Sequence, residues 1–410
     1  MLTRRTAVVV FLALAFAYFL SAMVRAITAT LSPTLIPEFD LQARDLGLLA
    51  GGYFLGFAAT QLPLGHWLDR HGPKKVVACF LSFAVLGSVA FAMASRFSDL
   101  LIARILTGIG VSACLMAPLT GFRRWLSPAT QLRANSWMLM TGSMGMLCST
   151  LPVQWLLPVM GWRPMFWGLA LLNVLAIAVI VWQVPRWRVA PLATPEKATQ
   201  PGWLASYRDV WRHPYFRRLV PLGFFSYGGL LAMQTLWAGP WMIRVSGYSP
   251  LEAATGLFWI NVTMLCTFWS WGWLNPWLSR RGWHANRLMT WGIPLNLCVQ
   301  LILVGIGPGT GTLAWALFCM TNSVVSLAQP AVGLAFPPAL AGRALSAFNL
   351  VIFTGVFAVQ WGFGLLVDGF LALGVATPQA FQAAMGLFLL CSVAAYAFFW
   401  ADRADNPNPT

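Results

Sequence analysis

Two arginines, Arg25 and Arg104, lie inside long runs of apolar residues. An ionised side chain in hydrocarbon costs about 2.5–3.5 kcal/mol on insertion scales, so a charge at such a position is a candidate for function. A guanidinium offers its donors in a planar fork that matches a carboxylate or a phosphonate. Both arginines are expected at a similar depth in the membrane. If their helices face one cavity, the two guanidiniums would form a receptor for a small anion.

The acidic residues lie elsewhere. Those expected on one side of the membrane are near loops and the ends of apolar runs: Glu38, Asp40, Asp45, Asp99, Glu252 and Asp368. A cation carrier usually needs a carboxylate inside the membrane, whereas an anionic substrate would neutralise the two arginines itself. The alternative is that either arginine extends outward to lipid headgroups.

Neutral polar side chains recur at helical spacing in the second part of the chain. Tyr227 and Gln234 are seven residues apart, and Asn322 and Ser326 are four apart, so each pair is expected on one helix face. They could hydrogen-bond a substrate opposite the two arginines. They could equally join neighbouring helices, a contact worth only about 0.6 kcal/mol. The sequence leaves both interpretations open.

The elements that must position these residues are membrane-spanning helices. The 410 residues are 59% hydrophobic and 9% charged, which excludes both an ordinary soluble domain and a disordered chain. Long continuous apolar runs favour helices over the short alternating strands of a barrel. The expected spans are 7–30, 45–67, 75–95, 99–121, 134–157, 164–184, 218–243, 253–277, 286–306, 311–335, 344–367 and 377–400. The predicted fold is an all-α membrane protein with twelve transmembrane helices.

The basic residues predict the orientation of these spans. Of 26 Lys and Arg residues, 20 lie at the termini and in the even-numbered loops, four lie in the odd-numbered loops, and two are Arg25 and Arg104. By the positive-inside rule both termini are cytoplasmic. The net charge of +15 is therefore a consequence of topology and requires no nucleic-acid partner.

The chain divides into two similar halves. The longest hydrophilic stretch, 185–217, separates a six-helix half at 1–184 from a second at 218–410. Residues 67–72 read WLDRHG after the second span, and 277–282 read WLSRRG after the eighth. Because the two segments occupy the same topological place, they indicate an internal duplication and two pseudo-symmetric halves.

At this point the chain resembles the major facilitator superfamily. The segment GHWLDRHGPKK, from Gly65 to Lys75, resembles the signature between spans two and three of that family, with Pro73 where a basic residue is common. The second copy departs at Asn275 and Ser279. ARILTGIG at 103–110 and GRALSAFN at 342–349 resemble the family's motifs in spans four and eleven. The residues that carry the gating motif are Gly65, Asp69, Arg70, Gly72 and Lys74.

The resemblance implies several properties. Spans one, four, seven and ten would line a central cavity, which would bring Arg25 and Arg104 together. Asp69 would rest against the start of span eleven and hold one conformational state. An arginine at the place of Arg104 is often structural or tied to proton coupling in that family, an alternative to its binding substrate.

The expected function is secondary active transport of a small organic anion by alternating access, coupled to protons as a symporter. We expect a monomer in the bilayer of a bacterial inner membrane, without cofactor, metal or catalytic activity. No His, Cys, Asp and Glu cluster or phosphate-binding loop is present in the sequence. The alternatives are a drug or metabolite efflux antiporter of the same fold, and a sensor of this shape that does not transport.

Overall fold

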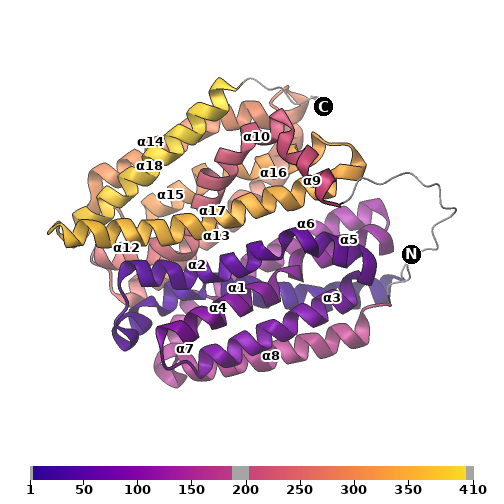
Figure 1. The fold of residues 1–410 in the computed structure, drawn as a ribbon, viewed down its shortest axis with the longest axis horizontal. Helices are drawn as coiled ribbons and strands as arrows, with labels where there is room; N and C mark the ends of the chain where they lie inside the picture. Colours follow the sequence, from indigo (N-terminus) through magenta and orange to yellow (C-terminus); the bar gives the residue numbers. More distant parts are fainter. Residues whose placement is uncertain (1–2, 187–202, 403–410) are drawn as a thin grey trace.

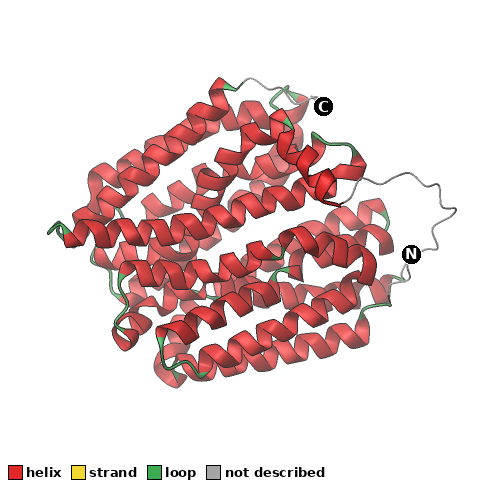
Figure 2. Cartoon of the chain, viewed as in Figure 1, coloured by secondary structure: helices red, strands yellow, loops and turns green. Residues whose placement is uncertain are grey.

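The protein is described from a computed structural model, and the description concerns residues 3–186 and 203–402. Every regular element within these residues is a helix, as Figure 2 shows. The helices of the first half are α1 (Arg4–Phe39), α2 (Ala43–Ala59), α3 (Gln61–Ala92), α4 (Phe97–Val111), α5 (Ala113–Trp125), α6 (Pro128–Cys148), α7 (Leu151–Met160) and α8 (Trp162–Gln183).

The second half is more broken. It follows a short helix, α9 (Trp203–Arg212), and begins with one span of five consecutive segments: α10 (Pro214–Pro221), η1 (Leu222–Tyr227), α11 (Gly228–Ala232), η2 (Met233–Trp237) and α12 (Ala238–Arg244). Its other helices are α13 (Pro250–Arg280), α14 (Ala285–Ile306), η3 (Gly307–Gly309), α15 (Thr312–Asn322), η4 (Ser323–Leu327), α16 (Ala328–Leu334), α17 (Pro338–Ala372) and α18 (Thr377–Ala401).

Ten helical segments of the described chain are long and apolar enough to cross a membrane. They coincide with ten of the twelve expected spans. The second expected span is divided between α2 and the start of α3 at Thr60, and the fifth between α6 and α7 at residues 149–150. Large apolar side chains point outward, with Trp182 88% and Leu313 73% exposed, as a lipid-facing surface requires.

The two halves occupy separate regions of the molecule, indigo to magenta for the first and rose through orange to yellow for the second in Figure 1. The sequence repeat recurs as a backbone feature. Gly72 and Gly282 hold the same place in the two copies, and their φ angles are 74° and 77°. Positive φ is open to glycine and disfavoured for other residues, so both copies use glycine for a backbone angle that other residues rarely adopt.

Successive spans alternate in direction, so the connections fall at two ends of the bundle. The α1–α2, α3–α4, α7–α8 and α17–α18 connections share one end, which we name the far end. There Arg163 at the start of α8 forms an ion pair of 2.6 Å with Glu38 at the end of α1 and donates to the carbonyl of Ala94 after α3. The opposite end, the near end, holds the start of α1 and the end of α18.

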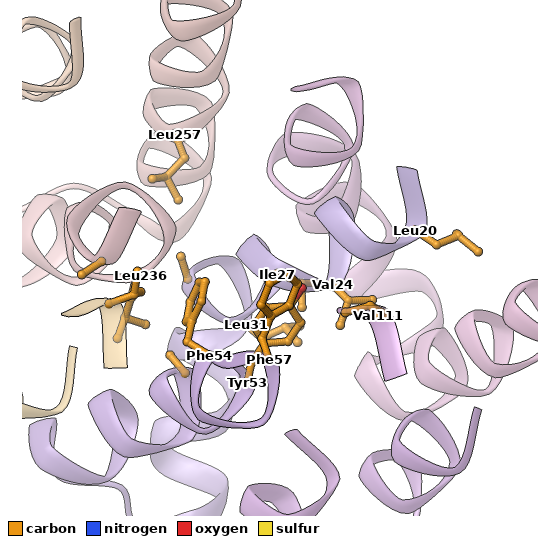
Figure 3. Packing of buried hydrophobic residues seen from close by; sticks show 14 of the residues in the cluster. Leu20, Val24, Ile27, Leu31, Tyr53, Phe54, Phe57, Val111, Leu236 and Leu257 are labelled. Atoms are coloured by element: carbon orange, nitrogen blue, oxygen red, sulfur yellow. The ribbon is translucent and has the colours of Figure 1, made fainter. Parts of the chain in front are cut away.

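The two halves pack against each other through α2 and α17. Phe54 of α2 stacks on Phe353 of α17 with ring centroids 6.2 Å apart, and the ring of Phe57 is tilted against the same Phe353 at 4.3 Å. Figure 3 shows Phe54 and Phe57 in the hydrophobic core beside Ile27 of α1, with Leu236 of the second half on the left. This shared core places α1, α2 and the start of the second half around one point.

The central segment contains more structure than the loop expected at 185–217. Residues 187–202 lie outside the described chain, but α9 follows them as an amphipathic helix. Its Tyr207 and Val210 are buried, and the Tyr207 hydroxyl donates to the carbonyl of Leu62 at 3.2 Å. Burial of one apolar face explains why a polar stretch forms a helix here.

Candidate functional site

Arg25 of α1 lies where the two halves meet. It is partly buried, and its Nε is fully covered and has no hydrogen-bond partner. Its guanidinium is 5.9 Å from the ring centre of Phe57. The hydroxyls of Tyr18 and Tyr53 are close enough to interact with it electrostatically. The immediate surroundings of this charge are therefore aromatic rings and neutral hydroxyls.

Arg104 of α4 reaches the same region but is more enclosed. Its side chain is 1% exposed, and its Nη1 donates to the carbonyl of Val24 at 2.9 Å. Its guanidinium lies over the ring of Tyr53, 5.1 Å from the centroid. Its Nε and Nη2 are buried without partners. Arg104 is thus fixed to the peptide next to Arg25.

Tyr53 of α2 connects the two arginines. Its ring lies under Arg104, and its hydroxyl interacts with Arg25 and donates to the carbonyl of Ser21 at 3.3 Å. Tyr53 is completely buried beside Phe57 (Figure 3). The two arginines therefore share a neighbour. They reach it from α1 and α4.

Tyr227 brings the second half into this cluster. It ends η1, a wider π-helical turn, and interacts electrostatically with Arg25 and Tyr18 of α1. Wide turns of this kind are frequent at functional sites because they redirect a side chain within a helix. The cluster of Arg25, Tyr18, Tyr53 and Tyr227, which we name the junction cluster, thus contains side chains from both halves.

Gln234 contacts α13, whereas Tyr227 contacts α1. Its amide donates to the side-chain oxygen of Asn261 in α13 at 3.0 Å. Seven residues after Gln234, the indole N–H of Trp241 donates to the hydroxyl of Thr310. The turns η1 and η2 change the number of residues per turn, so the three side chains contact different neighbours. A regular helix would have kept them on one face.

Asn322 and Ser326 occupy the corresponding part of the span made of α15, η4 and α16. The amide of Asn322 donates to the carbonyl of Ser226 at 3.2 Å, next to Tyr227. Ser326 lies in the tighter turn η4 and is partly buried. Gln329 donates to Asn349 of α17 at 2.6 Å. The amides of Gln234 and Asn322 therefore make the interhelical contacts that the sequence offered as one of two interpretations.

The gating motif lies at the near end. Gly65 faces the start of α17, where a β-carbon would lie 3.8 Å from the hydroxyl of Ser346. Gly72 forms the turn between the second and third spans, and Arg70 is exposed. Lys74 is partly buried. The side chain of Asp69 lies outside the described part of the structure.

Sequence reasoning missed Tyr18 and Tyr53 as neighbours of Arg25. A signal for the first was present, since Tyr18 precedes Arg25 by seven residues and so shares its face of α1. No spacing connects Tyr53 with Arg25, because they come from different helices. The buried thiol of Cys114 also lies near Arg25. Within the described residues, no three His, Cys, Asp or Glu side chains gather as a metal site would need.

The sequence matches the model of the Major Facilitator Superfamily over residues 14–360. The chain is similar to the gallate transporter of Pseudomonas putida, with 25% identity over 87% of this chain and 84% of that protein. It is also similar to the probable L-galactonate transporter of Escherichia coli, with 25% identity over 55% of this chain but 48% of the relative. A third relative is the 4-hydroxybenzoate transporter of Pseudomonas aeruginosa, with 24% identity over 58% of this chain and 59% of the relative.

Solved structures share the fold. A bacterial homologue of the human lysosomal transporter Spinster matches with a TM-score of 0.79 and 17% identity, covering 98% of both chains. The D-xylose–proton symporter matches with a TM-score of 0.78 and 15% identity, covering 98% of this chain and 99% of the other. At these identities the likeness concerns the arrangement of the helices.

Proposed function

This chain is a member of the Major Facilitator Superfamily, and from that premise we propose that it is a secondary active transporter which moves a small organic anion by alternating access. The two six-helix halves would rock about a site at their junction. The site would be exposed first at one end of the bundle and then at the other.

The observation that carries the proposal is the junction cluster. Arg25 is a cation surrounded by neutral groups from both halves, and part of its guanidinium has no partner. A carboxylate bound beside the guanidinium would accept hydrogen bonds from it and neutralise the charge. Arg104 adds a second positive charge one neighbour away, across Tyr53. We propose Arg25 as the principal ligand.

The other residues of the proposed site are expected to contribute less to the binding energy. Tyr227 would contribute a hydroxyl from the second half. Gln234, Asn322 and Ser326 would line the same side, and the first two already donate to protein oxygens. Their share of the binding energy is therefore proposed to be smaller than that of Arg25.

The first substrates to test are hydroxylated acids. Three similar proteins are named as transporters of gallate, 4-hydroxybenzoate and galactonate. Each of these anions combines a carboxylate with hydroxyl groups. A guanidinium beside three tyrosines offers a partner for the carboxylate, hydroxyls for the polar substituents and ring faces for an aromatic body.

The proposed setting is a bacterial inner membrane with both termini in the cytoplasm, which makes the far end external. The chain would act as a monomer, as a carrier and without cofactor. Proton symport is the proposed coupling. In vesicles, an inward proton gradient should then accelerate uptake, and a protonophore should remove that acceleration.

The test is uptake of gallate and 4-hydroxybenzoate into liposomes that contain the purified protein. Hydrogen bonds to charged groups contribute about 1.5–3 kcal/mol, so Arg25→Gln should weaken binding by about 10- to 150-fold. Arg25→Lys keeps the charge without the fork and should be intermediate. Arg244→Gln, an exposed arginine at the end of α12, is the control and should leave affinity unchanged.

Two results would contradict the proposal. Unchanged affinity in both Arg25 variants would remove this residue from the site. Preferred transport of a lipophilic cation, indifferent to Arg25, would favour an efflux antiporter, and binding without flux would favour a sensor.

A further inference from the structure

At the far end, one carboxylate of the second half binds the start of a helix of the first half. Asp368 of α17 accepts hydrogen bonds from the backbone N–H of Ala43 at 3.1 Å and of Arg44 at 2.8 Å. These are the first two residues of α2. The first N–H groups of a helix have no partner within the helix and carry a partial positive charge. A carboxylate is therefore a strong partner for them.

The contact exists only while the two halves touch at this end. A β-carbon on Gly364 of α17 would lie 2.3 Å from the carbonyl oxygen of Ala43, and one on Gly47 of α2 would lie 2.3 Å from that of Gln360. The two backbones thus approach each other directly over this stretch. A small rotation of the halves would separate Asp368 from α2.

A second carboxylate at the same place acts differently. Asp45 lies in the first turn of α2 and accepts from the backbone N–H of Gln42 at 3.1 Å. Its partners are within its own half. The same helix start therefore carries one carboxylate that stabilises the helix and one that ties it to the other half.

We propose that Asp368 and the N–H groups of Ala43 and Arg44, which we name the far-end latch, stabilise the state in which the far end is closed. This inference rests on the proposed function, because alternating access supplies the second state. The latch must break for that end to open. The free energy of the contact would therefore set the balance between the two states.

A similar contact is expected at the near end of the bundle. There the family resemblance pairs Asp69, after the second span, with the start of α17. At the far end the roles are exchanged, since α17 supplies the carboxylate and α2 supplies the helix start. Each end of the pair would thus carry a contact that favours its own closure.

The experiment measures, without substrate, exposure of the interface between the halves at a point on the far-end side of Arg25. Ala29 of α1 is 4% exposed and faces Gly239 of α12 across the halves, where a β-carbon would lie 3.4 Å from the Ala29 carbonyl oxygen. A cysteine at Ala29, in a full-length chain without its seven native cysteines, reports opening through its reaction with a membrane-impermeant maleimide. The chain is held in liposomes with the far end outside.

In Asp368→Asn, loss of a charge-assisted bond should raise the labelling rate at Ala29→Cys on the order of tenfold. Asp45→Asn is the matched control, with the same charge removed from the same helix start. It should lower the melting temperature but leave labelling within twofold. Asp368→Ala removes both acceptor oxygens, so it should label at least as fast as Asp368→Asn, and it replaces that variant if the latter does not fold.

Equal labelling in the Asp368 and Asp45 variants would overturn the latch. Because labelling needs no substrate, this result is distinct from a failure of the proposed function. An active latch in a protein that takes up no organic acid would contradict the function alone. Uptake with equal labelling would contradict the latch alone.

Discussion

Arg104 is a charge that the fold encloses without neutralising. Its guanidinium has one hydrogen bond, to the Val24 carbonyl, and a tyrosine ring beneath it, while two of its nitrogens have no partner. Buried groups of this kind reduce stability, since each lost interaction with water is left uncompensated. A buried charge under that penalty is a candidate for function, and we propose that Arg104 helps to position Arg25 through the Val24 carbonyl.

Arg104→Met tests this trade between stability and function. The unbranched apolar side chain fills a similar space and removes two unsatisfied nitrogens together with one hydrogen bond. Replacement of buried charges by apolar residues is often neutral or stabilising by about 1–4 kcal/mol. We expect the free energy of unfolding to stay equal or rise by about 1 kcal/mol, and substrate uptake to fall at least tenfold. Denaturation and liposome uptake measure the two effects.

The account would be contradicted if Arg104→Met lowered the free energy of unfolding by an amount equivalent to its fold-loss of uptake. It would indicate that the arginine mainly holds α4 to α1. Arg104→Lys is the companion variant. It retains charge but not the planar group that lies over Tyr53, so it should recover only part of the uptake.

Irregular turns within helices determine where the polar side chains of the second half go. The span at 214–244 contains the wide turns η1 and η2, and that at 312–334 contains the tight turn η4. Tyr227 consequently meets Arg25, whereas Gln234 meets Asn261. The first half reaches the junction with regular turns in α1 and α2. The first half therefore contributes the two arginines, and the second half contributes the helices with irregular turns.

The repeated glycine turns predict an effect on stability. Gly72 has φ 74° and ψ 166°, a conformation essentially restricted to glycine, and Gly282 has φ 77°. Alanine in such a conformation costs about 1–3 kcal/mol, so Gly72→Ala and Gly282→Ala should each lower the melting temperature. Gly272→Ala in α13 is the control, because it has a helical backbone and no atom within 4 Å of the added carbon.

Equal melting temperatures for all three variants would show that the two turns relax at no cost. A loss in Gly282→Ala but not in Gly72→Ala would instead limit the strain to the second copy. Thermal unfolding in detergent, followed by tryptophan fluorescence, distinguishes these outcomes.

In the molecule as a whole, the basic residues are expected mainly at one end of the bundle. The near end is expected to hold 20 of the 26 basic residues, and the far end holds the carboxylates Glu38, Asp45, Asp99 and Asp368. Such a distribution fixes the orientation of a membrane protein during insertion.

Cysteine labelling in intact cells checks this orientation. Leu373, in the α17–α18 connection, is 79% exposed, and Arg281 is exposed between α13 and α14. In a chain without native cysteines, Leu373→Cys should react with an impermeant reagent outside the cell. Arg281→Cys should react only after the membrane is permeabilised. The opposite pattern would place the termini outside and invert the proposed direction of the latch.

The sequence by itself determined the helical membrane fold and the positions of ten of the spans, because hydrophobic runs and turn residues act locally along the chain. It also identified Arg25 and Arg104, since an ionised group in an apolar run is conspicuous in any context. Only the tertiary structure decided that Tyr53 of α2 lies between them and that Tyr227 reaches Arg25 while Gln234 does not. It also decided that Asp368 binds the start of α2. These contacts join residues far apart in sequence and depend on how helices approach and where their turns widen, which no local pattern encodes.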